Sequence, residues 1–510
     1  MDTTFYSKIV PLHELVVHLE HRREQGRTIV QSHGVFDLIH PGIITHLESA
    51  RKQGDILVVT VIKDKDVRRG PGRPIFPETL RAESVAALQG VDYVSIVDDE
   101  EPFECVRTIK PDVFAKGQAF KERDRKTDQK IFEEEREFYF GKSKIYETKG
   151  FSLSSTHIVN NFLQIYPEET QVFLKNFAAR HSFHDIVEAI ESLRDLKVLL
   201  IGEGIIDEYH YCSAMGKSAK SHLVVSRYLA HEVFNGGAFA IANHLAGICD
   251  KVDLVTLLGR QDSREEFIRE NLKENIVPAF FYRDDASTVI KKRYLDQYLN
   301  QKIFEVNYLN DDFICESLER DIVSYLEARI PDYDIVLVSD FGHGFITERI
   351  KEVIQKKSRK YAVNTQTNAA NAGYNLITKY QKPYFVCLDE SEIRLAAQQR
   401  HENIRLIAQK IQKSIDTKYL IVTLGKKGSI GIDNSHEVNM TPIFSSKVID
   451  TIGAGDAFFA FTAPCVAKDF ALDVVSFIGN AVGALAVQIV GNKRPVEKYE
   501  LITFMDAMLR

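Results

Sequence analysis

The sequence predicts an α/β protein built from two domains, and three observations support this prediction. The chain has 510 residues, too many for one ordinary hydrophobic core, so two domains or more are expected. Runs rich in Val, Ile and Leu alternate with helical stretches in both halves, which is typical of parallel strands buried on both faces of a sheet. Residues 161–193, between the halves, are charged and helix-like and carry no phosphate-binding turn. We therefore expect a domain over residues 1–163, a helical linker over residues 164–193 and a larger domain over residues 194–510.

Each half supplies its own set of buried strands. In the first half the runs lie at residues 28–31, 55–62 and 91–98. In the second half they lie at residues 197–204, 251–259, 333–340 and 418–425. Residues 476–491 are the best candidate for a membrane span, but this segment is too short and is interrupted by glycine. We expect a buried helix there.

Composition excludes several classes of protein. Hydrophobic residues make up 44% and charged residues 27% of the chain, as in soluble globular proteins. The net charge of -7 gives no general attraction to nucleic acid or to an anionic membrane, so neither is expected as a partner. Six cysteines without C-x-x-C spacing argue against a zinc site or a disulfide framework. Together with an N-terminus that lacks the features of a signal peptide, they favour a cytoplasmic protein.

The stretch "SHGVFDLIHPGI", residues 32–43, predicts a phosphate-binding turn between a strand and a helix. Backbone N–H groups at a helix start, with the positive end of the helix dipole, favour phosphate. A histidine beside them adds a donor for charge that develops on the α-phosphate, and attack by a phosphate oxygen needs no general base. The alternative is a structural turn with a buried histidine. The candidate residues are Gly34, Phe36, Asp37, His40 and Gly42.

Three further segments of the first half favour the phosphate-binding interpretation. Residues 70–83 place arginines on a loop and at a helix start, and Lys116 lies at the end of an expected strand. Ser154, Ser155 and Thr156 precede an apolar helix, where hydroxyl groups cap the helix and also reach phosphate oxygens. The dense charge run at residues 121–141 is interpreted as a solvated helix or loop.

In order and spacing these segments resemble the cytidylyltransferase-like nucleotidyltransferases over residues 25–163, in particular the adenylyltransferase domains that make ADP-heptose. The resemblance implies ATP, with CTP as the alternative, as the nucleotide. The family pattern H-x-G-H is present as His40-Pro41-Gly42-Ile43, so one of the two histidines that contact the triphosphate is replaced by Ile43. Losing that donor would cost ~10²-fold or more in rate if nothing replaced it. His46, one helical turn further on, is a candidate for partial replacement.

The stretch "IDTIGAGDAFFAFTA", residues 449–463, is the strongest signal in the chain. Gly453, Ala454 and Gly455 free backbone amides at a helix start, which form an anion hole for a phosphoryl group in transfer. Asp456 follows where a carboxylate takes a proton from an attacking hydroxyl, which, unlike a phosphate, needs a base.

This stretch resembles the signature of ribokinase-like sugar kinases of the phosphofructokinase B type, and the resemblance extends over residues 195–500. It implies an α/β domain with a small β lid, in which Asp207 binds sugar hydroxyls and Gly236 and Gly237 let the sugar approach the backbone. It also implies that Glu392 lies in the magnesium-linked position. Further nucleotide contacts are implied for Thr423, Gly425 and Gly428.

Asp389 replaces an asparagine three residues before the magnesium-linked glutamate. Three further departures from the kinase pattern bear on the substrate. Ala240 replaces an asparagine after the glycine pair. His343 stands where a lysine is usual, and "VNTQTN" at residues 363–368 replaces a D-P-K type of segment. We interpret these differences as altered specificity, with a damaged kinase as the alternative.

A sugar kinase and a nucleotidyltransferase on one chain predict consecutive steps that make a nucleotide-activated sugar. The chain resembles the bifunctional enzymes of ADP-heptose synthesis with the two domains in swapped order. The resemblance implies Mg²⁺ and ATP at both sites, a sugar or sugar phosphate as the other substrate, and a homodimer. The alternative is a regulatory protein that binds nucleotide and sugar after losing one or both activities.

Overall fold

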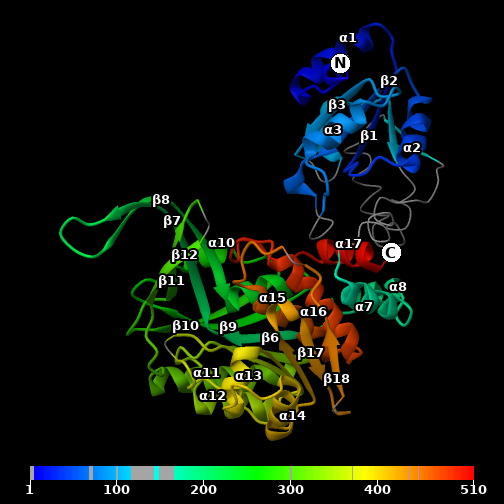
Figure 1. Ribbon diagram of the computed structural model, residues 1–510. Helices are drawn as coiled ribbons and strands as arrows, with labels where there is room; N and C mark the ends of the chain where they lie inside the picture. The colour runs from blue at the N-terminus through cyan, green and yellow to red at the C-terminus, as the bar shows by residue number, and fades with distance from the viewer. Residues whose placement is uncertain are drawn as a thin grey trace. The chain divides into compact units, whose positions relative to one another are not determined.

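The computed structural model describes residues 5–67, 73–98, 102–116, 143–148, 166–298, 301–369, 371–435, 437–445 and 447–509. The chain divides chiefly into two compact units, residues 1–168 and residues 169–505. Each unit contains a mainly parallel sheet flanked by helices, which confirms the predicted α/β class (Figure 1).

The first unit contains a parallel sheet in the strand order β3-β2-β1-β4-β5. The strands are β1 (Ile29–Gly34), β2 (Ile56–Ile62), β3 (Tyr93–Val97), β4 (Val113–Lys116) and β5 (Lys144–Glu147). The helices are α1 (Leu12–Glu24), α2 (Pro41–Arg51), α3 (Glu78–Ala86) and α4 (Phe103–Ile109). The strand order reverses between β1 and β4, and open α/β sheets bind ligands at the carboxyl ends of strands at such a switch point.

The second unit is built on a sheet in the order β10-β9-β6-β13-β14-β15-β16-β17-β18, parallel from β10 to β16. Its strands are β6 (Val198–Gly202), β9 (Val252–Gly259), β10 (Ile276–Arg283), β13 (Ile335–Asp340), β14 (Tyr361–Thr365), β15 (Phe385–Asp389), β16 (Tyr419–Thr423), β17 (Ser429–Ile432) and β18 (Val438–Thr441). The four runs predicted in this half correspond to β6, β9, β13 and β16.

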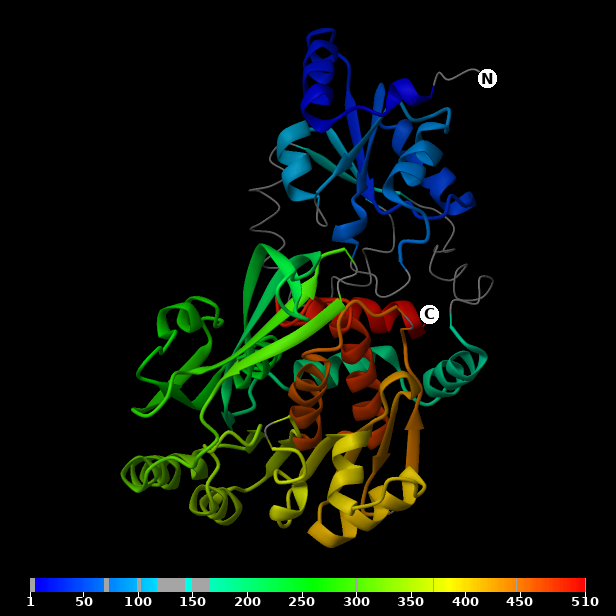
Figure 2. The ribbon, with the colours of Figure 1, turned by 60° about the vertical axis from the view of Figure 1, so that its left-hand side comes forward.

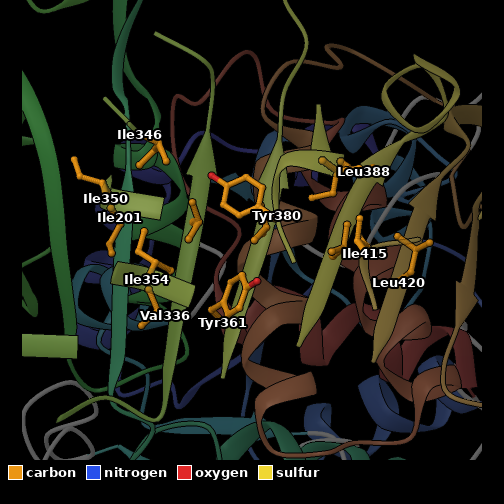
Figure 3. Packing of buried hydrophobic residues seen from close by; sticks show 14 of the residues in the cluster. Ile201, Val336, Ile346, Ile350, Ile354, Tyr361, Tyr380, Leu388, Ile415 and Leu420 are labelled. Atoms are coloured by element: carbon orange, nitrogen blue, oxygen red, sulfur yellow. The ribbon is translucent and has the colours of Figure 1, made fainter. Parts of the chain in front are cut away.

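Helices cover both faces of this sheet. Apolar side chains of α11 (Glu316–Arg329), α12 (Glu348–Lys357), α13 (Glu390–Ala397) and α14 (Ile404–Ile415) form one continuous core with the strands. Figure 3 shows Ile350 and Ile354 of α12 and Ile415 of α14 in this core. On the other face lie α15 (Ala454–Ala467) and α16 (Leu472–Ala486) (Figure 1), and α9 (Ala238–Leu245) contacts α15. The segment predicted as a buried helix falls largely on α16, most of whose side chains are buried. No helix within the described ranges is long and apolar enough to cross a membrane.

A smaller sheet in the order β12-β11-β7-β8 is the expected lid (Figure 2). Its strands are β7 (Gly204–Lys217), β8 (Val224–Gly237), β11 (Val289–Asp296) and β12 (Gln301–Tyr308). β11 pairs with β7 only as far as Cys212, so the rest of β7 and β8 continues as a two-stranded hairpin. Two further helices are α10 (Glu265–Glu270) and α17 (Lys498–Leu509).

The segment expected as a linker forms α7 (Glu168–Ala178) and α8 (Phe183–Glu191). α7 packs on the second unit: Phe177 is fully buried and its ring stacks on Phe477 with centroids 4.3 Å apart. The Thr170 hydroxyl donates to the carbonyl of Ile443 at 3.3 Å. Residues 169–193 therefore belong to the second unit rather than forming a free connection.

Candidate active sites

His40 caps the helix that follows β1. Its extended backbone (φ -137°, ψ 165°) ends the turn, and Nδ1 accepts a hydrogen bond from the Gly42 N–H at 3.2 Å. Because Nδ1 is an acceptor, a neutral imidazole carries its proton on Nε2. Burial lowers the pKa of His40, which favours this neutral form. The turn thus presents a histidine N–H donor at the start of α2.

His46 does not replace the histidine that Ile43 displaces. Its Nε2 lies 2.8 Å from the Ser32 hydroxyl and its Nδ1 lies 2.7 Å from the Thr148 hydroxyl. Burial lowers its pKa to about 4. Both ring nitrogens are therefore used to tie α2 to β1 and to the residue after β5. The suggestion that His46 supplies a second phosphate donor is therefore wrong. Ile43 itself is partly buried and packs against the core of the first unit.

Asp37 and Arg81 organise the loop before α3. Both carboxylate oxygens of Asp37 accept the Ile75 N–H at 2.9 Å, and the Phe76 N–H adds a further bond at 2.9 Å. Arg81 is fully buried and donates to the carbonyl of Ile62 at 2.7 Å, among other bonds. The guanidinium also forms an ion pair with Asp64 at 2.6 Å, so this arginine is committed to protein groups. Sequence spacing does not reveal that backbone carbonyls surround the guanidinium.

The other candidates of the first unit are distributed around the switch point. Gly34 ends β1, and buried Phe36 follows in the left-handed region with φ +51°. Lys116 ends the neighbouring strand β4 and is also buried. The predicted helix-capping residues Ser154, Ser155 and Thr156 lie outside the described residues, as does the charge run at residues 121–141.

A cavity of about 290 Å³ in the second unit brings together most of the kinase candidates. It lies where the carboxyl ends of central strands meet the start of α15 and lid strands β7 and β11. Predicted residues that line it are Asp207, Gly237, Glu392, Thr423, Gly453, Gly455 and Asp456. Gly425 and Gly428 do not line it; they shape the turn between β16 and β17, where Gly428 (φ +88°) has no room for a Cβ beside the Thr441 carbonyl.

The start of α15 has the geometry of an anion hole. Gly453 has φ +83°, and a Cβ there would lie 2.0 Å from Asn492 Oδ1, so only glycine fits. A Cβ on Gly455 would meet nothing within 4 Å. The amides of Gly455 and Asp456 belong to the first turn of the helix, which has no intrahelical acceptors for them. The Ala454 N–H donates to the Thr451 carbonyl at 3.4 Å. The Gly455 and Asp456 N–H groups can bind a phosphoryl group.

Asp456 has the environment of a general base. It is buried, and the Gln366 side-chain amide donates to its Oδ1 at 2.8 Å. Burial raises its pKa to about 7, and the negative charge of Asp207 acts in the same direction. The hydrogen bond from Gln366 and the charge of Lys291 act in the opposite direction. A carboxylate with a pKa near neutrality is a stronger base than an ordinary aspartate.

Asp207 and Gly237 line the cavity, and Gly236 lies beside Asp207. Asp207 forms a buried ion pair with Arg293 of β11 and accepts a bond from the Asn492 amide at 3.4 Å. A Cβ on Gly236 would lie 2.2 Å from Asp207 Oδ2, and one on Gly237 (φ +54°) would lie 2.6 Å from the Glu203 carbonyl. Both glycines are therefore required by neighbouring protein atoms, the first of them by the carboxylate itself.

The residues around Glu392 fit a magnesium ion. Its carboxylate accepts the backbone N–H groups of Asp389 at 2.8 Å and Thr367 at 3.2 Å, and burial raises its pKa to about 8. A cation would favour the charged form of such a carboxylate. Asn364 Oδ1 and Thr367 Oγ1 are buried without a hydrogen-bond partner in the part of the chain that the structure describes, and both residues line the cavity. Oxygen atoms of this kind are the ligands that Mg²⁺ prefers.

Two of the sequence departures lie outside this cavity. His343 is buried and contacts Asp311 at 2.7 Å, beside Glu203 and away from the main cavity. Ala240 lines a separate cavity of about 130 Å³, which shares Asn492 with the main one. Ala240 therefore lies near the main cavity without lining it.

Lys291, Arg293, Gln366 and Asn492 also line the main cavity and were not predicted from the sequence. Lys291 and Arg293 are two residues apart in "VIKKRYLD", so a strand there places them on one face, but the stretch has no regular alternation that predicts the strand. Gln366 lies in a segment noted only for its departure from a family pattern. Asn492 has no local signal, because it reaches the site through a loop after α16.

A switch-point turn with a capping histidine, followed by a lidded α/β domain with an anion-hole helix, defines a nucleotidyltransferase fold joined to a carbohydrate kinase. The model of the pfkB family of carbohydrate kinases matches residues 196–498, and the chain belongs to this family. The Cytidylyltransferase-like model matches residues 32–161. Both domain types predicted from the sequence are thereby confirmed.

Several curated proteins with the name "Bifunctional protein HldE" are similar to this chain. The protein from Desulfatibacillum aliphaticivorans is 43% identical over 119 residues, 23% of this chain and 24% of that protein. The protein from Alcanivorax borkumensis is 40% identical over 148 residues, 29% and 30%. The protein from Campylobacter jejuni subsp. jejuni serotype O:2 is 23% identical over 300 residues, 58% and 62%. Each match spans less than two thirds of the relative's length.

Solved structures share the fold of the kinase unit. Phosphofructokinase-2 from Escherichia coli in complex with substrates and products has a TM-score of 0.51 at 17% identity, covering 62% of this chain and 100% of that chain. The complex of the same enzyme with fructose-6-phosphate has a TM-score of 0.50 at 16% identity, with the same coverage.

Proposed function

We propose that this chain is a bifunctional enzyme of nucleotide-sugar synthesis. Its second unit phosphorylates a sugar or sugar phosphate with ATP, and its first unit transfers AMP or CMP to a sugar phosphate. The product is ADP-heptose or the nucleotide derivative of a related sugar. The observation that carries the proposal is the buried carboxylate of Asp456, which lies in the first turn of α15 next to the backbone amides of the expected anion hole.

In the kinase unit Asp456 takes the proton of the acceptor hydroxyl, whose oxygen then attacks the γ-phosphorus of ATP. The first amides of α15 stabilise charge on the phosphoryl group in transfer. Asp207 binds hydroxyl groups of the sugar, and Arg293 holds that carboxylate in place. Lid strands β7 and β11 supply these two residues, so the lid orients the sugar.

Magnesium would neutralise charge on the phosphates that both units handle. In the kinase unit the residues that would hold it are Glu392, Asn364 and Thr367. Their oxygen atoms border the same cavity as Asp456.

In the nucleotidyltransferase unit the Nε2–H of His40 donates a hydrogen bond to an α-phosphate oxygen, where negative charge develops as an oxygen of the sugar phosphate attacks the α-phosphorus and pyrophosphate leaves. No general base is required, because the attacking oxygen is already ionised. The start of α2 and Lys116 hold the triphosphate at the switch point between β1 and β4. The hydroxyl groups of Ser154, Ser155 and Thr156 complete this proposed site.

We further propose that the protein acts in the cytoplasm as a homodimer, and that the domain border lies near residues 163–168. Six free cysteines without the spacing of a zinc site support the location. Consecutive reactions on one chain support a shared sugar pathway.

A second candidate function is nucleotide and sugar binding without transfer in the first unit. The specific support is Ile43, together with the use of both His46 nitrogens by Ser32 and Thr148. The first unit then lacks the second donor of its family.

One experiment separates these functions. The protein is incubated with Mg²⁺, ATP or CTP, and a panel of sugars and sugar phosphates, and products are identified by mass. We expect one sugar class to gain a phosphate and one sugar phosphate to gain a nucleotidyl group. A phosphorylated sugar without any nucleotide sugar supports the binding function of the first unit; no product at all contradicts the proposed enzyme.

A further inference from the structure

We propose that Gln366 is the positioning residue of the kinase base. Its side-chain amide holds one carboxylate oxygen of Asp456 and leaves the other for the hydroxyl group of the sugar. This inference rests on the proposed kinase function and adds to its machinery a residue that the family pattern did not identify.

Two rigid elements bring the residues together. Gln366 directly follows β14, and its backbone is held on both sides: its N–H donates to the Asp340 carbonyl at 2.9 Å and its carbonyl accepts the Asn375 amide at 3.2 Å. Asp456 lies in the first turn of α15. The bond of 2.8 Å from Gln366 Nε2 to Asp456 Oδ1 therefore fixes the rotation of the carboxylate in the cavity.

A neutral partner suits a group that must accept a proton. The ionisable groups that face Asp456 are Asp207 of β7, Lys291 of β11, Cys387 of β15 and Glu392 of α13. Gln366 adds a hydrogen bond to this set without adding a charge. A cation at the same place would stabilise the carboxylate by its full charge and make it a weaker base. Burial and the charge of Asp207 raise the pKa of Asp456 to about 7 even though the hydrogen bond from Gln366 lowers it.

The charge of residue 366 should therefore control the pH dependence of the kinase. Gln366→Lys should move the acidic limb of kcat/KM to lower pH by about 1–3 units, and Gln366→Glu should move it to higher pH. Gln366→Met removes the donor at similar size, and should lower kcat by ~10-fold with a smaller change in KM. Ala369→Lys is the matched control, because it adds the same charge at an exposed position three residues away.

If Gln366 acted only in folding, the acidic limb of the kcat/KM profile would not move in opposite directions in the two charged variants. The test measures kcat and KM for ATP and the sugar from the product panel across pH 5.5–9, on the full chain. Opposite shifts in Gln366→Lys and Gln366→Glu, with the wild-type profile in Ala369→Lys, support the proposal. Superimposable profiles for all variants overturn it.

A second measurement tests the inference without turnover. The full chain is labelled with ¹³C at the aspartate carboxyl groups, and the Asp456 signal is assigned by its loss in Asp456→Asn. We expect its titration midpoint to fall in Gln366→Lys and to rise in Gln366→Glu. Unchanged midpoints overturn the inference about Gln366, whereas shifted midpoints in a protein that phosphorylates no sugar contradict only the proposed function.

Discussion

At the scale of single residues, opposing effects set the basicity of Asp456. Burial and the negative charge of Asp207 raise its pKa to about 7, while the hydrogen bond from Gln366 and the charge of Lys291 act in the opposite direction. Asp456 is therefore protonated below this pH and ionised above it, so the base is present only toward neutral and alkaline pH.

We expect Asp456→Asn to lower sugar phosphorylation by ~10²-fold or more, because the amide cannot accept the hydroxyl proton. In the wild-type protein the rate should decline as pH falls below about 7, and the variant should lack this decline. Sugar-dependent ADP formation measured against pH checks both expectations. Asp195→Asn, on an exposed residue, is the control, and near-normal activity of Asp456→Asn would assign the base elsewhere.

His40→Ala should lower the rate of nucleotidyl transfer by ~10²-fold or more with a modest loss of nucleotide binding. The reason is that it removes the hydrogen-bond donor that stabilises negative charge on the α-phosphate in the transition state. Ile43→His should leave the rate unchanged or raise it, since it restores the second donor of the family. Formation of the nucleotide sugar and equilibrium nucleotide binding are measured together. His13→Ala, on a side chain 82% exposed, is the control. A wild-type protein that is inactive until Ile43→His is introduced would show that this turn has lost its catalytic role.

At the scale of elements, α7 contributes to the core of the kinase unit. Phe177 is fully buried and its ring stacks on that of Phe477. The centroids of the Phe177 and Phe173 rings lie 5.8 Å apart. A helix that buries an aromatic side chain in this way stabilises the unit on which it packs.

Phe177→Ala should lower the free energy of unfolding of the kinase unit by ~3–5 kcal/mol, because it removes a large side chain and leaves a cavity. Val172→Ala on the same helix, at a side chain 53% exposed, should change it by less than ~0.5 kcal/mol. Denaturant unfolding of both variants is the measurement. If Phe177→Ala had the same free energy of unfolding as the wild-type protein, α7 would not contribute to the stability of the kinase unit.

At the scale of the whole molecule, the two units have separate sheets and separate candidate sites. Residues 1–165 and residues 166–510 should therefore each fold and keep their own activity. A fragment of residues 190–510 should be less stable than residues 166–510, because it lacks Phe177 and exposes Phe477. Solubility, thermal unfolding and the two activities are compared across the fragments. Loss of both activities on separation would mean that the units depend on each other.

Local sequence determined the fold class, the two domain types and the helix starts at which phosphate is expected. These features depend on short-range patterns: continuous apolar runs for parallel strands, and glycine before a helix for an anion hole. Asp456 and His40 were identified because each lies inside such a pattern. The lid strand β12 was not predicted, because all of its side chains are exposed and it carries no apolar run.

Tertiary structure alone decided which polar side chains are committed to other protein groups. Arg81 and His46 have the residue types of phosphate ligands, but backbone carbonyls and two hydroxyl groups use their donors and acceptors. Gln366 and Asn492 acquire roles only because strand ends and loops distant in sequence meet at one cavity. The physical reason is that a buried polar atom must find a partner, and that partner comes from whichever element packs beside it.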